Sequence, residues 1–329
     1  MIKIAIDAMG GDYGALPIVQ GALDALEHKD FEAVLIGDKQ VIEPLLHQVS
    51  DKLLSRINIV HCDEFIAMEQ QATDSLKNHK TSIYKAIQMH KEGEVNGVVS
   101  AGHSGATMSL ATLRIGRIKG ILRPAIATLM PTISGRPTLL LDVGANTDCK
   151  PEHLYQFYFM GKEYTQDILG VSDPKIGLLS NGHEPSKGNE LTKEAFSMLK
   201  DEPCFVGNIE GSNIFDGSID VVICDGFTGN VVLKSSEGAA SAIGTLAKDM
   251  VLRSSIISKV AAFMLKKVAK EVAKKVDYAE YGGAPLIGID GCVIVAHGKS
   301  NEKAIKNAIF QALEYANSNI IKDLKGDFE

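Results

Sequence analysis

Several short glycine-containing segments follow apolar runs and could bind an anion. One is Ser100–Ala106, in which Gly102, His103, Ser104 and Gly105 come directly after a run of small apolar residues. Small residues let the backbone approach a ligand, and a helix that begins here would direct free N–H groups at it. Phosphate is the anion that this pattern favours. The alternative is a tight turn between a strand and a helix, with Ser104 as the helix N-cap.

A second segment of this kind is Asp225–Asn230. Asp225 could bind a hydroxyl group or a metal ion, whereas Thr228 and Asn230 could bind phosphate oxygens where a helix begins. The same predicted binding loop contains Gly226 and Gly229. Helix capping and turn formation are the alternative roles for these residues.

Two carboxylates, Asp7 and Asp12, flank the pair Gly10 and Gly11 near the start of the chain. Carboxylates in one loop could position a lysine or a metal ion. An Asx turn followed by a helix cap would use the same residues.

Binding of phosphate also requires cations. Arg123 precedes an apolar run, Lys187 lies in a segment between a predicted strand and helix, and Lys234 follows the Asp225 segment by one helical turn. Each alone is typical of a solvated surface charge, but at one rim they would bind phosphate. His103 and His297 lie in similar loops, where a lone histidine is more often structural than catalytic.

These residues give a set of predicted roles. No G-x-S-x-G surrounds Ser104, so we expect no covalent nucleophile. Asp7, Asp142 and Asn146 are expected to orient the cations. We assign catalysis to Lys187, Asp225, Asn230 and Ser104. Phosphate or substrate binding is assigned to Asp7, Gly10, Gly11, Gly102, His103, Gly105, Arg123, Asp142, Asn146, Gly226, Thr228, Gly229, Lys234 and His297.

The elements that must position these residues alternate along the chain. Apolar runs predict strands at Ile2–Ile6, Ala33–Gly37, Gly97–Ala101, Thr138–Asp142, Lys175–Ser180, Ile219–Asp225 and Cys292–Ala296. Periodic segments between them predict helices at Leu16–Glu27, Ser82–Glu92, Leu154–Ile168, Leu191–Leu199 and Glu302–Asn317. This alternation is typical of a largely parallel sheet covered on both sides. We therefore expect one continuous α/β/α domain over residues 1–329, with its polar loops converging beyond the strand ends.

Composition narrows the class of protein. The net charge of −7 argues against a nucleic-acid-binding protein. The five cysteines are odd in number and form no C-x-x-C pair, which favours a reducing cytosol over a disulfide or zinc framework. The N-terminus lacks the pattern of a signal peptide, and no run of about 20 apolar residues could span a bilayer.

Residues 253–276 differ from the rest of the chain because they carry seven basic side chains and one acid. From Leu265 onward the pattern predicts an amphipathic helix. Before it, Ile256, Ile257, Val260, Phe263 and Met264 point in other directions, which predicts a bend near the helix start. We expect this excursion to bind an anionic membrane surface through these five residues and Leu265. A dimer interface or core packing is the alternative.

Taken together, the segments resemble the bacterial acyl-acyl carrier protein:phosphate acyltransferases of phospholipid synthesis. The resemblance runs nearly end to end and rests on IAIDAMGGD (4–12), VVSAGHSGA (98–106), RPAIATLMP (123–131), LLLDVGAN (139–146) and longer stretches at 176–195, 207–234 and 281–301. That family usually has Asn then Thr in place of His103 and Ser104, and Gly-Glu-Glu around Gly182-His183-Glu184.

The resemblance implies a Rossmann-like three-layer α/β/α sandwich, shared with phosphotransacetylases and isopropylmalate-type dehydrogenases. It implies a cytoplasmic, membrane-associated homodimer without cofactor or metal, acting on inorganic phosphate and acyl carrier protein. The product would pass to a membrane glycerol-3-phosphate acyltransferase. Because the carrier is acidic, we expect it to dock on a basic patch.

Three other functions are alternatives for a protein of this predicted fold. A phosphotransacetylase would use an acyl-coenzyme A donor instead of the carrier protein. A dehydrogenase is disfavoured because no G-x-G-x-x-G follows Ile2–Ile6. A lipid-binding scaffold without activity would not need Asp225, Asn230, Arg123 and Lys187 together.

Overall fold

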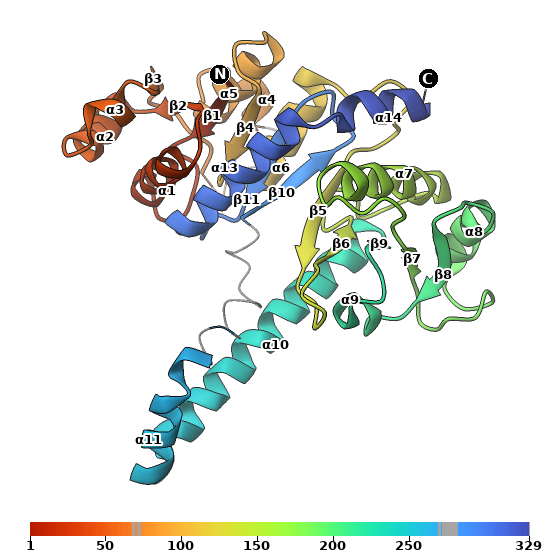
Figure 1. Ribbon diagram of the computed structural model, residues 1–329. Helices are drawn as coiled ribbons and strands as arrows, with labels where there is room; N and C mark the ends of the chain where they lie inside the picture. Colours follow the sequence, from red (N-terminus) through yellow and green to blue (C-terminus); the bar gives the residue numbers. More distant parts are fainter. Residues whose placement is uncertain (68–69, 71–73, 269–270, 272–281, 329) are drawn as a thin grey trace.

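A single sheet runs through the whole molecule. The computed structural model describes residues 1–67, 70, 74–268, 271 and 282–328, and Figure 1 shows their arrangement. Within these residues the sheet has eleven strands. From one edge to the other they are β3 (Ile57–His61), β2 (Glu32–Gly37), β1 (Lys3–Asp7), β4 (Gly97–Ser100), β11 (Val293–Ala296), β10 (Gly283–Ile287), β5 (Ala125–Met130), β6 (Thr138–Leu141), β9 (Val221–Ile223), β7 (Ile176–Leu179) and β8 (Phe205–Ile209).

The sheet is mostly parallel, with seven parallel and three antiparallel pairings among the described strands. All three antiparallel pairings involve β10 or β5 in the middle. The strand direction reverses three times in succession, at the β11–β10, β10–β5 and β5–β6 pairings. The block β3, β2, β1, β4 and β11 therefore runs opposite to the block β6, β9, β7 and β8 when the pairings are followed across the sheet. The sheet therefore consists of two parallel blocks joined by an antiparallel centre.

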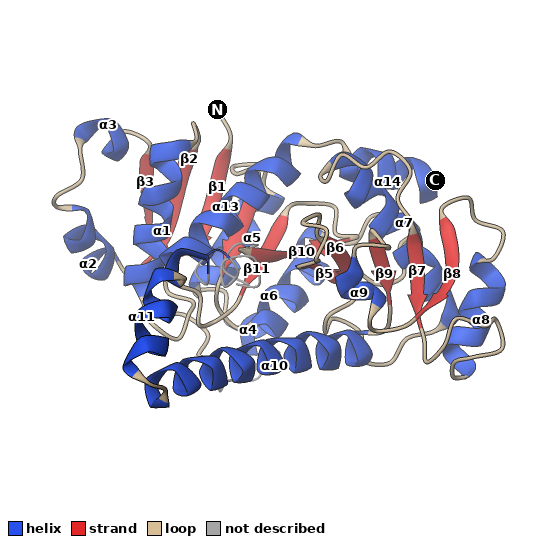
Figure 2. Ribbon diagram, turned by 60° about the horizontal axis from the view of Figure 1, so that its bottom comes forward, coloured by secondary structure: helices blue, strands red, loops and turns tan. Residues whose placement is uncertain are grey.

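Helices cover both faces (Figure 2), which confirms the three-layer α/β/α architecture. One face carries α1 (Ala15–His28), α7 (Pro151–Asp167), α8 (Glu190–Leu199), α13 (Glu302–Asn317) and α14 (Ile320–Phe328). The other face carries α5 (Ser82–Lys91), α6 (Ser104–Leu110), the π-helical turn Ala111–Ile115 and α9 (Asn213–Asp216). Short helical segments lie at α2 (Lys39–Ile42), the 3-10 turn Glu43–Leu46, α3 (Asp51–Leu54) and α4 (Asp74–Lys77).

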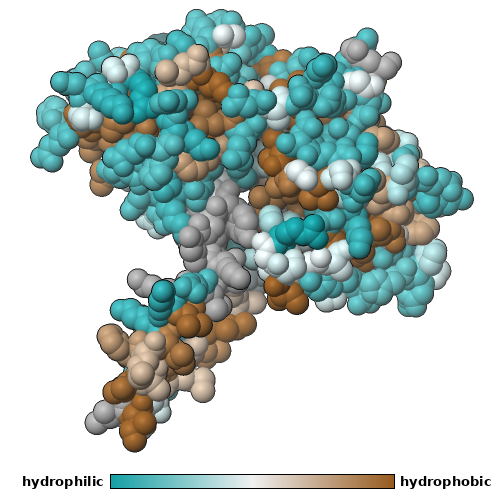
Figure 3. All heavy atoms as spheres, viewed as in Figure 1, coloured by the Kyte–Doolittle hydropathy of each residue, from teal (hydrophilic) through white to brown (hydrophobic). Residues whose placement is uncertain are grey.

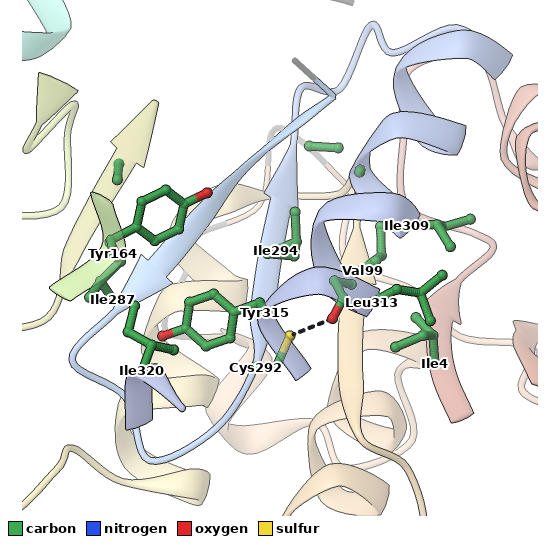
Figure 4. Close-up of a cluster of buried hydrophobic side chains, with 14 of the residues drawn as sticks. Ile4, Val99, Tyr164, Ile287, Cys292, Ile294, Ile309, Leu313, Tyr315 and Ile320 are labelled. Atoms are coloured by element: carbon green, nitrogen blue, oxygen red, sulfur yellow. Dashed lines mark hydrogen bonds between the residues drawn. The ribbon is translucent and has the colours of Figure 1, made fainter. Parts of the chain in front are cut away.

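The core is built from aliphatic side chains, with aromatic residues at a few positions. Figure 4 shows Tyr164 and Tyr315 from α7 and α13 beside Ile287 and Cys292. The Cys292 thiol donates to the carbonyl oxygen of Ala312 at 3.5 Å, and burial raises its pKa to about 12. This cysteine acts as a small apolar residue, as its position beside a strand predicts.

One pair of helices projects from the sandwich. α10 (Gly226–Arg253) is a single helix of 28 residues, and α11 (Ile256–Met264) returns alongside it (Figure 1). The helical excursion predicted for residues 253–276 therefore begins earlier, within α10. The segment 226–253 contains no proline that would end the helix. The chain reverses at Ser254 and Ser255, and the Ser255 hydroxyl caps α11. The predicted bend is thus a reversal between two helices. Of the predicted amphipathic segment, residues 269–270 and 272–276 lie outside the described part.

Candidate functional site

The first group of polar loops surrounds Asp7, and we call it the Asp7 cluster. Parallel pairing aligns Asp7 with Ser100 and Ser100 with Val295, so β1, β4 and β11 end side by side. The Ser100 hydroxyl donates to Asp7 Oδ2 at 2.8 Å and accepts the Gly102 N–H at 3.1 Å. Asp7 is buried, and burial raises its pKa while Ser82, Ser100 and backbone N–H groups oppose the shift.

Glycines allow the loops of the Asp7 cluster to touch. A Cβ atom at Gly10 would lie 2.6 Å from Asp7 Oδ2 and 2.8 Å from Gly102 Cα, so no side chain fits there. The Asp12 N–H donates to the Gly298 carbonyl at 2.8 Å, which fastens the first loop to the loop after β11. The structure therefore brings Asp7, Gly10, Gly11 and Gly102 together, as the sequence predicts.

The helix cap beside this cluster is His103 rather than Ser104. His103 Nδ1 accepts the Ala106 N–H at 3.3 Å, whereas Ser104 is the exposed first residue of α6. An accepting Nδ1 leaves the proton of a neutral ring on Nε2, which is a donor available to an anion. The N–H groups of Ser104 and Gly105 have no hydrogen-bond acceptor among the described residues.

His297 and Lys234 connect this cluster with α10. His297 Nδ1 accepts the Lys299 N–H at 3.1 Å. Burial lowers the pKa of His297, and the Lys234 ammonium lowers it further. Lys234 itself pairs with Glu237 at 2.9 Å on the exposed side of α10. The two residues are thus close enough to interact, but a carboxylate already neutralises Lys234.

The second group of loops surrounds Asp142, and we call it the Asp142 cluster. Asp142 Oδ1 accepts the N–H groups of Ile126, Gly144 and Ala145 at 2.9–3.1 Å. Its Oδ2 accepts the backbone N–H of Asn146 at 2.7 Å and the side-chain amide at 2.9 Å. Burial raises the pKa of this fully buried carboxyl, and the hydrogen bonds oppose the shift.

Asp142 and Asn146 therefore hold backbone in place. The prediction that they orient cations does not describe their contacts, because the hydrogen bonds of Asp142 within the described residues come from N–H groups. The Asn146 amide also donates to the Pro124 carbonyl at 2.7 Å. Arg123, the residue before Pro124, is exposed and lies near His153, whose pKa is lowered by burial first and by Arg123 second.

The start of α10 is locked against this loop. Asp225 caps the helix: its Oδ1 accepts the Thr228 N–H at 2.9 Å and its Oδ2 accepts the Thr228 hydroxyl at 2.7 Å. A Cβ at Gly226 would lie 2.8 Å from Asn146 backbone atoms, and one at Gly229 only 1.9 Å from the Asp142 carbonyl oxygen. Asn230 is exposed beside Gly144. Capping thus occupies Asp225 and Thr228, which is the alternative that the sequence left open.

Lys187 lies in the loop after β7, which begins next to the Asp225 segment. The parallel pairing of Leu178 with Ile223, continued by two residues, places Ser180 level with Asp225. Asn208 of β8 supports the loop, because its amide donates to the Glu184 carbonyl at 2.9 Å. Ser180 Oγ and Asn208 Oδ1 are buried without a partner among the described residues. Lys187 is exposed on this loop.

The predicted site residues thus form two clusters, which α10 links through Lys234 and His297. Ser100 stands in the first predicted segment without a role of its own, and Ser180 and Asn208 were not predicted as site residues; all three build the loops from within the sheet. Polar residues at the ends of apolar runs were the signal for the two serines. Asn208 lies mid-strand beside Gly207, where no such signal exists.

Apolar side chains are exposed on the projecting helices, as Figure 3 shows. Ile257, Phe263 and Met264 are 82%, 74% and 77% exposed, and Val260 and Leu265 are also exposed. α10 exposes Ile243, Leu246 and Met250 along its length. The side chain of Ile256 lies outside the described part. No helix among the described residues is long and apolar enough to cross a membrane.

This α/β fold, with polar loops after the strand ends, is also the fold of phosphotransacetylases. A phosphotransacetylase from Streptococcus pyogenes superimposes with a TM-score of 0.61 at 17% identity, covering 96% of this chain and 94% of that one. A phosphotransacetylase from Staphylococcus aureus gives a TM-score of 0.61 at 14% identity, over 96% and 94% of the two chains. At these identities the likeness concerns the fold alone.

Sequence relatives define the family more closely. Residues 2–323 match the family described as "Fatty acid synthesis protein". The chain is 57% identical to the phosphate acyltransferase of Nitratiruptor sp., over 97% of this chain and 96% of that protein. It is 58% identical to that of Campylobacter concisus, over 98% and 97%. The chain therefore belongs to the phosphate acyltransferase family and is an acyltransferase.

Proposed function

We propose that this protein transfers a fatty acyl group from acyl carrier protein to inorganic phosphate and so forms an acyl phosphate. The observation that supports the proposal most directly is the near-full-length identity of 57–58% to proteins named phosphate acyltransferase. The acyl phosphate would serve glycerol-3-phosphate acylation by a membrane acyltransferase.

The reaction needs no cofactor. A phosphate oxygen attacks the thioester carbonyl carbon, a C–O bond forms, the C–S bond breaks, and the thiolate leaves with the electron pair. Phosphate is already partly dianionic at neutral pH, and a thiolate is a good leaving group. Positioning the two reactants can lower the barrier by about 7–11 kcal/mol, and one donor to the developing oxyanion adds roughly 3–4 kcal/mol.

Two cations with exposed side chains are suited to phosphate. Arg123 lies beside the Asp142 loop, and Lys187 lies on the loop that Asn208 supports. The N–H groups of Ser104 and Gly105, with His103, are suited to the oxyanion or to a phosphate oxygen. Asp225 and Asp142 then act by fixing the backbone that surrounds these groups.

The test is phosphate-dependent release of free carrier protein from acyl carrier protein. Lys187→Ala should raise the KM for phosphate about 10- to 100-fold, because a charge-assisted hydrogen bond is lost. Lys193→Ala, an equally exposed change on α8, is the matched control. Turnover only with acyl-coenzyme A would establish the phosphotransacetylase alternative, and no turnover with either donor would favour the scaffold.

We further propose that the α10–α11 hairpin joins two copies of the chain and places the dimer on an anionic membrane surface. The apolar row of Ile243, Leu246 and Met250 is suited to a second copy. The apolar residues of α11 would enter the lipid interface, while Arg253, Lys259, Lys266 and Lys267 meet anionic headgroups at about 1 kcal/mol each. The protein would then be cytoplasmic and peripherally bound.

Replacing Ile257 and Phe263 with Asp should release the protein from anionic vesicles without changing its activity on soluble substrates. The control is Ile133→Asp, at an 86% exposed position in the loop between β5 and β6. Sedimentation with vesicles measures membrane binding, and analytical ultracentrifugation measures whether the protein remains a dimer. A double variant that still sediments with vesicles, or that dissociates into monomers, would show that α11 has a structural role.

A further inference from the structure

The surface formed by α4, α5, α6 and the π-helical turn has an unusual charge. Residues 74–91 and 95–141 contain nine Lys or Arg residues and one acid, Asp74 at the start of α4, in a protein whose net charge is −7. Such a one-sided distribution attracts a negatively charged partner and raises its rate of association.

Tertiary packing gathers part of this charge into one face. α4 packs against α6, and α5 packs against the π-helical turn. Tyr84 stacks on His79 at 4.6 Å between ring centroids, and the Arg114 guanidinium lies 4.9 Å above the Tyr84 ring. Arg114 also contacts His79 Nε2 at 3.2 Å. We call the surface formed by Lys77, His79, Lys80, Tyr84 and Arg114 the basic face.

Acidic residues lie around this face, and one of them reaches it. Glu64 accepts a hydrogen bond from the Asn78 amide at 2.7 Å, and Asp63 lies next to it in the chain. Glu92 and Glu94 follow the C-terminal end of α5. Glu64 thus meets the face at Asn78, between Lys77 and Lys80, but Lys77, Lys80 and Arg114 outnumber the acids there.

A recess of about 360 Å³ opens beside Tyr84. Val60, Tyr84 and Met89 line it together with the polar residues His79, Lys85, Gln88 and Glu94. Protein interfaces commonly combine a pocket for an apolar anchor with a polar rim that sets orientation. The recess and the basic face have these two properties.

The basic face lies next to the Asp7 cluster. Ser82, the first residue of α5, lies beside the Asp7 carboxyl and lowers its pKa. Lys80 precedes it by two residues, and α6 begins at Ser104 in the same cluster. A protein bound on this face would thus sit at the edge of the predicted site, where an attached thioester arm could enter.

We propose that the basic face is the docking surface of the acidic carrier protein that delivers the acyl thioester. This inference rests on the proposed function and adds the location of its protein partner. A row of acidic side chains on the carrier would pair with Lys77, Lys80 and Arg114, and one apolar side chain of the carrier would enter the recess. Exposed charges mainly raise the rate of association, and dissolved salt screens them, so docking should weaken as the salt concentration rises.

The test reverses two exposed charges, in Lys77→Glu/Lys80→Glu. We expect about a tenfold rise in KM for acyl carrier protein and a weaker salt dependence of that KM. The KM for phosphate and the rate with a short acyl-pantetheine thioester should stay unchanged. The matched control is Lys52→Glu/Lys200→Glu, at exposed positions on α3 and at the end of α8.

Three results would overturn the docking surface. They are an unchanged KM for the carrier, an equal loss with the pantetheine donor, and loss of vesicle binding with normal carrier kinetics, which would assign the face to a membrane. If wild-type protein turns over no acyl donor, the proposed function fails instead. Calorimetry with the carrier protein then decides docking alone: weaker binding by the variant supports it, and equal binding overturns it.

Discussion

The Asp7 and Asp142 clusters are built on the same plan but with different rigidity. Each places a buried carboxyl at the end of a central strand, and burial raises the pKa of both. Asp142 accepts five hydrogen bonds from N–H groups, whereas Asp7 accepts from the Ser100 hydroxyl at 2.8 Å and the Met9 N–H at 3.3 Å, with the Ser82 hydroxyl beside it. A hydroxyl can rotate to another partner, and a backbone N–H cannot.

This difference indicates a division of labour. The Asp142 loop holds the first turn of α10 through contacts so close that Gly226 and Gly229 admit no side chain. The Asp7 cluster instead borders the N–H groups of Ser104 and Gly105, which have no acceptor among the described residues. We infer that the first cluster fixes the geometry of α10 and the second has donors left for a ligand.

Removal of the Asp142 carboxyl should have the largest effect. Asp142→Ala leaves the buried backbone N–H groups of Ile126 and Asn146 without an acceptor and releases the loop at Gly144 and Ala145, so we expect a loss of about 3–5 kcal/mol of unfolding free energy. Asp7→Ala should cost about 1–2 kcal/mol, because the Ser100 hydroxyl can find another partner. Urea denaturation of both variants measures the comparison. Equal losses would show that the two carboxyls support the fold to the same degree.

Adding a side chain at Gly229, where α10 touches the Asp142 loop, should have a somewhat smaller effect on stability. Gly229→Ala places a Cβ 1.9 Å from the Asp142 carbonyl oxygen, and such overpacking should cost about 3 kcal/mol. Gly238→Ala lies in the same helix with no atom within 4 Å, and it should stabilise the protein by about 0.5–1 kcal/mol. Thermal unfolding distinguishes them. A shift of the same sign in both variants would contradict tight packing at Gly229.

The smallest expected effect is a change in the pKa of a histidine, which would show which cluster binds phosphate. Burial and a neighbouring cation lower the pKa of His297 in one cluster and of His153 in the other. A bound anion favours the imidazolium form, so phosphate should raise the pKa of the nearer histidine. NMR titration of both rings with and without phosphate makes the comparison. A rise at His297 alone places phosphate in the Asp7 cluster, and a rise at His153 alone places it beside Arg123.

The same histidines set a direction for the dependence of stability on pH. Their pKa values are lower in the folded protein than the ordinary 6.5. Folding therefore excludes protons, and this contribution to stability is present above pH 6.5 and is lost as the pH falls through the lowered values. The effect should be small in comparison with the loss caused by Asp142→Ala. Replacing His153 with Gln should reduce the loss of stability below pH 6.5, and an unchanged pH profile would show that His153 does not cause it.

Most of the elements could be predicted from local pattern. Unbroken apolar runs identified β1, β2, β4, β6, β7, β9 and β11, and helical periodicity identified α1, α5, α7, α8 and α13. The predictions omitted four strands. Two of them, β3 and β5, are apolar segments that were not assigned as strands. The other two are β8, which contains Gly207 and Asn208, and β10, which contains Pro285. Glycine, asparagine and proline are depleted in strands, so neighbouring strands rather than local preference place these two segments in the sheet.

The sequence by itself determined which segments are buried and which polar residues follow them, because apolar periodicity reports burial and strand ends directly. It also indicated Asp225 as a possible cap, because aspartate is a favoured N-cap residue where a helix follows an apolar run. Only the tertiary structure decided that β10 and β5 run antiparallel in the middle of the sheet. Strand direction depends on which distant strand supplies the hydrogen bonds, and no local pattern contains that information. The polar loops therefore form two clusters linked by α10, where the sequence alone predicted one.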